Sequence, residues 1–474
     1  MEIKRHYNAN RTDQGVDRLY RAFTRQTVGK KGATLLNSII RGKSSTIRHI
    51  SRDYAEQRAN YRFLNNPKVE EQALISECTS RLKERCKGRH LLVIQDGTEF
   101  DFTKHSGRLQ PNTGLGPVRI SSHTGFFLHP SLVLDAHTLA PLGFSHIEIW
   151  HRDKDSGTRH SRQYHKLPIE EKESFKWISS SEASKQNLAE SESITIIQDR
   201  EGDIYEQFAL VPDNKTHLLV RASTNRKLVS STDKLFDHLK NLEAQATYTI
   251  TVDEDIRNNR KGRQAEIEIR YQQVEIKRPK KCRSHLPKTL SLYIIEAKEV
   301  QGTVPKGETP VCWRLWTTHT IETAAQARTI IDWYSCRWFI EQVFRLMKKK
   351  GFAIESSELE TGWAIRKLAI LILQGVLKIC QMMVAYENEE SQPIAEVFEA
   401  QEIECMEKLN KKLEGNTEKT QNPYARDRLS WATWIIARLG GWNGYKSERP
   451  PGPITLKNGL DEFNSIYKGW LLLN

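Results

Sequence analysis

Two short apolar segments of this chain end in the same three residues, Ile-Gln-Asp. The first covers residues 91–96 (LLVIQD), and the second covers residues 194–199 (ITIIQD). Apolar runs of this length that are rich in β-branched residues are typical of buried central strands, which are usually parallel. If the two strands are neighbours in one sheet, Asp96 and Asp199 lie side by side at the same edge. We therefore expect an α/β fold with two carboxylates at the ends of adjacent strands.

The two aspartates favour a metal site. A single Asp at the end of a strand often caps a turn by accepting hydrogen bonds from backbone N–H groups, and this reading stays open for either residue alone. Two adjacent ionised carboxylates repel each other, however, and a bound divalent cation relieves that repulsion. The repetition of the pattern is what favours the metal.

The composition indicates a reduced, soluble protein without a membrane segment. Hydrophobic residues make up 38% of the chain, no stretch reaches the length of a membrane span, and the N-terminus lacks the apolar region of a signal peptide. The seven cysteines include no C-x-x-C pair, which argues against both a disulfide framework and a zinc knuckle. We expect a cytoplasmic location.

The positive charge of the chain is unevenly distributed. The net charge is +13, and residues 1–60 contain thirteen Lys or Arg against five Asp or Glu. A concentrated basic segment usually binds a polyanion, although a merely solvated basic face is the alternative. Further basic clusters at residues 257–263 and 277–288 favour nucleic acid as the partner.

The pattern of apolar residues, turns and charges suggests three regions. We expect a helical head at residues 1–70, a core at residues 71–386 with a β-rich insertion at about 215–320, and a helical C-terminal region at residues 387–474. Helices are expected at residues 17–24, 33–40, 47–62, 69–85, 172–181, 325–349, 364–387, 431–439 and 460–472, and strands at residues 91–96, 125–134, 143–150, 194–199, 218–222, 247–252, 264–271, 290–297 and 312–317.

The segment at residues 334–348 (YSCRWFIEQVFRLMK) carries a third acid. On one continuous helix at about 100° per residue, Tyr334, Arg337, Glu341 and Lys348 would share a face beside an apolar stripe. The simplest reading is an amphipathic helix whose polar face is solvated, with Arg337 and Glu341 as an i,i+4 pair. Three acids from separate elements are, however, what two-metal phosphoryl transfer requires, with the ions about 4 Å apart. Arg337 and Lys348 would then bind the phosphates.

At these residues the chain resembles the DDE transposases of the RNase-H-like fold, in the IS-four group of insertion sequences. The Y-x2-R-x3-E-x6-K motif of that group is met by Tyr334, Arg337, Glu341 and Lys348. Further matching blocks follow in order along nearly the whole chain, at residues 61–67 (YRFLNNP), 95–98 (QDGT), 172–177 (KESFKW), 199–204 (DREGDI), 307–310 (GETP) with Trp313, and 437–441 (ARLGG).

The resemblance implies a role for each of these residues. Asp96, Asp199 and Glu341 would be catalytic and would bind two Mg²⁺ ions, with Mn²⁺ as an alternative. Tyr334, Arg337 and Lys348 would hold the adjacent phosphates, and Trp313 would fill the space of a base flipped from the DNA stack, although a core tryptophan is the alternative. Arg221 would also contact DNA. The chain departs from the family pattern at Ser223, where a basic residue is expected.

The resemblance also implies an activity and its partners. We expect a cut-and-paste DNA transposase with an RNase-H-like core and helical flanking domains, which acts as a homodimer on terminal inverted repeats and target DNA in a bacterial cytoplasm. Cleavage would pass through a DNA hairpin before the 3′-hydroxyl ends are joined to the target. The alternatives are a catalytically silent DNA-binding inhibitor of transposition and an RNase-H-like nuclease without strand transfer.

Overall fold

The computed structural model describes residues 32–473, apart from residues 33, 37, 40–44, 52, 81, 120–121, 154–166, 232, 256–259, 284, 349–350, 387, 389–390 and 446–448. The chain divides into two compact units. We call Cys86–Asp96 with Gly157–Trp338 the sheet unit, and Met1–Arg85, Gly97–Ser156 and Phe339–Asn474 the helical unit.

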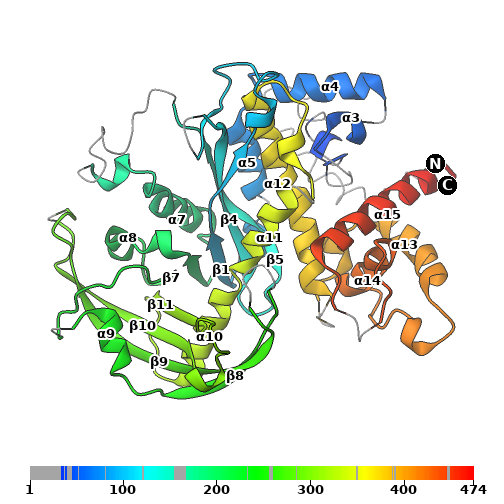
Figure 1. Cartoon of the computed structure of the whole chain (residues 1–474). Coiled ribbons are helices and arrows are strands. Elements are labelled where there is room, and N and C mark those ends of the chain that lie inside the picture. Colours follow the sequence, from blue (N-terminus) through cyan, green and yellow to red (C-terminus); the bar gives the residue numbers. More distant parts are fainter. Residues whose placement is uncertain are drawn as a thin grey trace, which may run out of the picture. The chain divides into compact units, whose positions relative to one another are not determined.

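The sheet unit is built on a mixed β-sheet (Figure 1). Three parallel strands lie at one side, in the order β1, β6, β7, and four antiparallel strands continue the sheet in the order β11, β10, β9, β8. Their bounds are β1 (His90–Gln95), β6 (Ser193–Gln198), β7 (Thr216–Arg221), β8 (Ala246–Val252), β9 (Arg263–Lys277), β10 (Thr289–Glu299) and β11 (Cys312–Thr317).

Helices cover this sheet and connect its strands. The unit contains α7 (Phe175–Asn187), α8 (Tyr205–Leu210), α9 (Leu235–Lys240) and α10 (Ala324–Ser335), together with the 3-10 turns η3 (Ile169–Glu171), η4 (Arg200–Gly202) and η6 (Gln301–Thr303). Helix α7 packs against β1, and α10 packs against β9 where the antiparallel strands curve around it (Figure 1). A capping box at Thr323 and Gln326 fixes the first residue of α10.

The helical unit is organised around one long apolar helix, α12 (Gly362–Ala385). It packs against α4 (Tyr54–Asn65), α5 (Glu71–Ser80), α14 (Leu429–Leu439), α15 (Pro453–Leu473) and strand β5 (Pro141–Trp150). Strand β5 forms a hairpin with β4 (Thr124–Asp135), which also pairs with β2 (Thr98–Asp101) and β3 (Gly116–Pro117). Further helices with described bounds are α3 (Ile47–Ile50), α6 (Lys83–Cys86), α11 (Trp338–Met347) and α13 (Ala400–Leu413), and the 3-10 turns with described bounds are η1 (Thr103–His105), η7 (Ile354–Ser356), η8 (Ile394–Glu396) and η9 (Glu418–Thr420).

Helix α12 is long and apolar enough to cross a membrane by composition, but it is a core helix. Of its most apolar window, 89% is buried inside the protein. Its few charged side chains are bound internally, as in Lys367, whose Nζ donates to the backbone oxygens of Leu64 and Asn66 at 3.1 and 2.9 Å. The burial of its apolar side chains in the core explains the high hydropathy of α12 without a membrane.

The mixed α/β class and most predicted elements are confirmed, including the two Asp-terminated strands, the β4–β5 hairpin and the β-rich block. The predicted helix at residues 47–62 is wrong, because α3 ends at Ile50 and the side chain of Asp53 caps a new helix by accepting from the Glu56 N–H at 2.8 Å. The predicted helix at residues 69–85 is likewise divided, into α5 and α6. The described residues between 32 and 39 are helical as expected, whereas the predicted helix at residues 17–24 lies outside the described residues.

Candidate active site

Asp96 and Asp199 follow directly on two hydrogen-bonded parallel strands. The register of β1 and β6 pairs His90 with Ser193 and continues to Ile94 with Ile197. Two residues further along, the same register sets Asp96 opposite Asp199, and both side chains are half-buried. The prediction that the two aspartates lie on neighbouring strand ends is therefore confirmed by the strand register.

A buried amide network holds the residues just before the aspartates. Gln95 and Gln198 are fully buried, and the Gln198 Nε2 donates to the Gln95 Oε1 at 2.7 Å. The Gln207 amide of α8 donates in turn to Gln198, and the Ser181 hydroxyl of α7 lies 3.4 Å from the Gln95 Oε1. Because buried amides are costly when unpaired, this network fixes the register of the strand ends that present the acids.

The Asp199 carboxylate also caps a turn, which is the structural alternative to a metal site. Its Oδ1 accepts a hydrogen bond from the Glu201 N–H at 2.8 Å and so caps the turn η4. A carboxylate has two oxygens and about four lone-pair positions, so this cap leaves capacity for a metal ion. Capping orients the carboxylate and is compatible with ligation.

Arg337 contacts the first aspartate directly. Its Nη1 donates to the Asp96 Oδ2 at 2.8 Å, and both side chains are about one-fifth exposed (22% and 19%). The guanidinium supplies positive charge beside the paired carboxylates, which is the electrostatic contribution that a metal cation would also make. This contact was not predicted, because the sequence suggested either Glu341 or phosphate as the partner of Arg337.

Tyr334 and Trp313 pack together close to the same charged groups. Their rings meet edge to face with centroids 5.4 Å apart, and Tyr334 is only 3% exposed. Burial raises the pKa of the Tyr334 hydroxyl, while the positive charges of Arg337 and Arg221 act to lower it and that of Asp199 acts to raise it. Arg221, at the end of β7, also donates to the backbone oxygen of Cys312 at 3.4 Å. The sheet unit thus brings together Asp96, Asp199, Arg221, Trp313, Tyr334 and Arg337.

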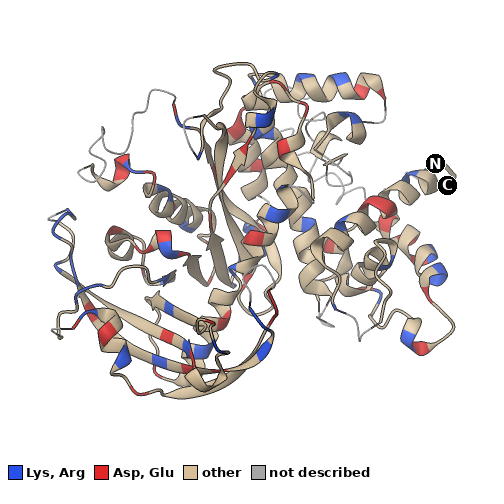
Figure 2. Ribbon diagram, viewed as in Figure 1, with Lys and Arg blue, Asp and Glu red and all other residues tan. Residues whose placement is uncertain are grey.

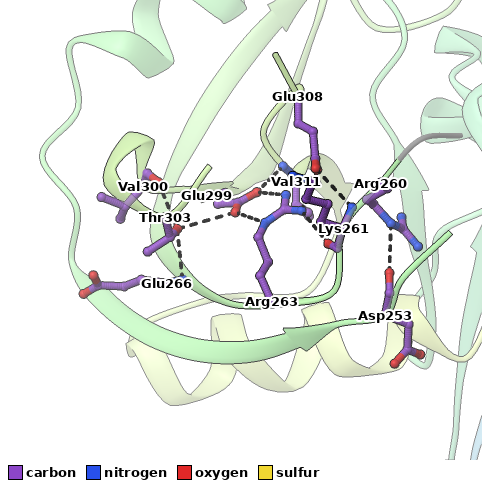
Figure 3. A network of polar contacts seen from close by, with 10 residues as sticks. All are labelled: Asp253, Arg260, Lys261, Arg263, Glu266, Glu299, Val300, Thr303, Glu308 and Val311. Atoms are coloured by element: carbon purple, nitrogen blue, oxygen red, sulfur yellow. Dashed lines mark hydrogen bonds and ion pairs between the residues drawn. The ribbon is translucent and has the colours of Figure 1, made fainter. Parts of the chain in front are cut away.

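The strand that carries Trp313 is held by a network of buried charges (Figure 3). Arg263, at the start of β9, donates to Glu299 at 2.7 and 2.9 Å and to Glu308 at 2.8 Å. The Glu299 carboxylate also accepts from the Val311 N–H at 2.8 Å, one residue before β11 begins. The block at residues 307–310 therefore has a structural role, since it fixes the loop that leads to Trp313.

The single helical face predicted for residues 334–348 is wrong. Helix α10 ends at Ser335, a turn at Cys336 and Arg337 follows, and α11 begins at Trp338. Glu341 is an exposed residue in the first turn of α11, in the helical unit. Lys348 follows the end of α11 in the same unit, with its Nζ 5.3 Å from the centre of the Phe100 ring. The turn separates residues that a continuous helix would have placed on one face.

The sequence did not indicate a role for Asp203. This residue lies in the segment that follows Asp199, and it binds the segment that follows Arg221. Its carboxylate accepts from the backbone N–H groups of Ser223 and Thr224 at 2.8 and 2.9 Å and forms a buried ion pair with Arg226. Ser223, where a basic residue was expected, therefore binds Asp203. The position of Asp203 in the block at residues 199–204 was the available signal, but its partners are distant in sequence.

Two half-buried carboxylates at adjacent strand ends are hard oxygen ligands of the type that Mg²⁺ prefers. Across the residues that the structure describes, no group of three or more His, Cys, Asp or Glu side chains is close enough to share a metal ion. The third ligand, Glu341, and the two-ion arrangement stay predictions.

Comparison with known protein families agrees with this chemistry. Residues 182–374 match the family model described as the transposase DDE domain. The matched segment contains Asp199, Trp313, Arg337 and Glu341, and it begins after Asp96. The match supports a place among the DDE transposases and a transposase function that acts on DNA.

Proposed function

We propose that this protein is a cut-and-paste DNA transposase of the IS-four group, with an RNase-H-like core. The observation that carries the proposal is the strand register that sets Asp96 opposite Asp199, in a chain whose residues 182–374 match a transposase DDE domain. Adjacent carboxylates at the ends of parallel strands are suited to metal-dependent phosphoryl transfer.

Asp96, Asp199 and Glu341 would hold two Mg²⁺ ions, with Mn²⁺ as an alternative. Bound ions stabilise the charge on the attacking and leaving oxygens of a phosphoryl transfer. Arg337, Lys348 and Arg221 would bind the DNA phosphates around the scissile bond. Arg337 would exchange its Asp96 partner for a phosphate when the acids bind metal, since both partners suit its guanidinium fork.

The reaction would consist of successive attacks on phosphorus. A water molecule attacks the phosphate at the transposon end and releases a 3′-hydroxyl. That hydroxyl attacks the opposite strand, which closes a hairpin on the transposon end and frees the flanking DNA. A second water opens the hairpin, and the regenerated 3′-hydroxyl then attacks a phosphate of the target.

Trp313 would stack where a base leaves the helix during hairpin formation. Tyr334 was expected to contact phosphate, but its buried ring packs edge to face on Trp313. We therefore propose that the main role of Tyr334 is to hold the Trp313 ring in place.

The remaining regions would supply recognition and assembly. The basic head at residues 1–70 would recognise the terminal inverted repeats, and residues 387–474 would contribute to a homodimer that joins two ends. The protein would act in the bacterial cytoplasm on nucleoid DNA.

The test is an end-cleavage and joining assay with the full chain, Mg²⁺ and a labelled duplex from the inverted repeats that flank the gene. We expect nicked, hairpin and joined products, all of which Asp199→Ala should abolish without loss of DNA binding. Asp233→Ala, at an exposed aspartate of the sheet unit, is the matched control and should be fully active.

The two alternatives give different results in the same assay. A nuclease without strand transfer would cleave the end but would not join pre-cleaved ends to a target. A silent inhibitor would bind the end and give no product with any divalent ion.

A further inference from the structure

The turn between β9 and β10 carries a dense group of basic residues that the proposed active site does not use (Figure 2). We define the basic ridge as this turn's exposed cations together with Lys227, which is hydrogen-bonded to it. Its members are Lys227, Lys277, Lys280, Lys281, Arg283 and Lys288.

Few acidic side chains neutralise the positive charge of the basic ridge. Arg283 pairs with Glu170, whereas none of the five lysines has an ion-pair partner among the residues that the structure describes. Between Lys277 and Lys288 the sequence contains no acid, and the acids that border the turn are Glu170, Glu206 and Glu275. The lysines therefore present a concentrated positive charge to solvent.

The protein holds this turn in a fixed position. The Tyr205 hydroxyl donates to the backbone oxygen of Pro287 at 2.8 Å, and the Lys277 N–H donates to the Lys227 backbone oxygen at 3.4 Å. The Arg278 N–H closes the turn by donating to the Lys288 oxygen at 2.9 Å, and Leu286 is buried beneath it. Because a buried residue and these hydrogen bonds anchor the turn, its lysines are held at a defined place on the surface.

The anchors connect the ridge to the second catalytic aspartate. Tyr205 begins α8, which follows the turn η4 that Asp199 caps. Cys282 of the ridge turn lies close to Glu206 of the same helix. Burial raises the pKa of the Cys282 thiol to about 12, and the negative charge of Glu206 adds to this effect. The ridge is thus tied to the segment directly after Asp199.

We propose that the basic ridge binds the phosphate backbone of target DNA during strand transfer. This inference rests on the proposed function. Five of the six cations are lysines, which act as point charges, and the ridge lacks the Asn, Gln and paired Arg side chains that read base edges. A surface of this kind binds duplex DNA without regard to sequence, as capture of arbitrary targets requires.

The test compares two charge-matched variants of the full chain. The ridge variant replaces Lys277, Lys280, Lys281 and Lys288 with Gln. The control replaces Lys83, Lys87, Lys104 and Lys240 with Gln, and these exposed lysines lie outside the ridge and outside residues 1–70 and 387–474. Each is assembled on pre-cleaved transposon ends. Binding of a target duplex of unrelated sequence is then measured as a function of salt, together with strand transfer and with cleavage of uncleaved ends.

We expect the ridge variant to cleave ends normally and to lose at least tenfold in target binding and strand transfer. The salt slope of target binding should fall by about 0.9 for each phosphate contact removed. The control should keep the wild-type slope. Normal cleavage separates this result from a failure of the proposed function, in which the wild-type chain itself would not cleave.

Two outcomes would overturn the inference. An unchanged target affinity and salt slope in the ridge variant would show that the target binds elsewhere. A loss confined to uncleaved ends, and dependent on the length of flanking DNA, would assign the ridge to the donor flank.

Discussion

Arg337 donates to the carboxylate of Asp96 at 2.8 Å, although the two residues are 241 positions apart in sequence. A guanidinium that neutralises one of two neighbouring carboxylates competes with any cation for the same site. The contact therefore couples the occupancy of the proposed metal site to the position of the residue that we propose binds phosphate.

Replacing Arg337 by Gln should lower the Mg²⁺ concentration at half-maximal end cleavage. A partly exposed ion pair is worth about 1 kcal/mol or less, so the expected shift is about twofold to fivefold, together with a lower maximal rate because a phosphate contact is lost. The measurement is a Mg²⁺ titration of cleavage at saturating DNA, with Arg337→Lys as the control that retains charge. A higher Mg²⁺ requirement in Arg337→Gln would contradict competition between the arginine and the metal.

Replacing Trp313 by Ala should impair hairpin formation more than the first nick. Base stacking contributes about 1–3 kcal/mol, which corresponds to roughly a five- to hundredfold defect at the step where a base is extruded. The ratio of nicked to hairpin product is measured on an end duplex with 2-aminopurine at the extruded base. Trp313→Phe, which keeps a ring against Tyr334, should recover most of the hairpin product. An equal loss of both products would assign Trp313 to the core.

Replacing Gln198 by Leu should destabilise the protein even though the side chain is fully buried and the substitution is apolar. The change leaves the buried amides of Gln95 and Gln207 without their partner, at a cost of about 1–3 kcal/mol in the free energy of unfolding. Gln272→Leu, at an exposed amide of β9, should change it by about 0.5 kcal/mol or less. Urea unfolding measures both, and equal effects would argue against a specific role for the amide network.

His319 should make the protein sensitive to acid. Burial, followed by the charges of His217 and His90, lowers its pKa to about 3, so the folded protein holds this ring neutral. In the unfolded chain the ring takes up a proton at about pH 6.5. The stability from this group is therefore complete above pH 6.5 and is lost as the pH falls from there toward 3, by up to about 1.4 kcal/mol per pH unit.

The variant His319→Gln tests this dependence. It retains a group that can bond to the Thr195 hydroxyl, which lies 2.8 Å from the His319 Nε2, but it does not titrate. Thermal unfolding between pH 7 and pH 4 should show a shallower fall in stability for the variant. Parallel curves for the two proteins would mean that other groups cause the acid sensitivity.

The parts of this site that sequence alone could predict are those that depend on local patterns. The repeated apolar run before Asp96 and Asp199 predicts two buried strands that are usually parallel, whereas their pairing as neighbours is shown by the strand register. The break between α10 and α11 was missed because residues 336 and 337 are Cys and Arg, and neither is a residue that usually ends a helix. The helical spacing of the apolar residues therefore runs on across residues 336 and 337, and only the folded chain shows the turn there.

Partners distant in sequence could not be predicted. The contact of Arg337 with Asp96, the pairing of Gln198 with Gln95 and the binding of Ser223 to Asp203 all depend on which strand ends meet. The Gln residues were visible only as part of a repeated triplet. Their buried hydrogen bond gives that repeat a physical reason.

The most direct test of the account is metal rescue at the two aspartates. Cysteine in place of a ligating Asp offers a soft sulfur, which binds Mg²⁺ poorly and Mn²⁺ better. Asp96→Cys and Asp199→Cys should bind end DNA normally, give no cleavage in Mg²⁺ and recover part of the cleavage in Mn²⁺, whereas Asp199→Ala should stay inactive in both ions. Substantial cleavage in Mg²⁺ by either cysteine variant, or no rescue by Mn²⁺ in a folded protein that binds DNA, would contradict the claim that these carboxylates hold the catalytic metal.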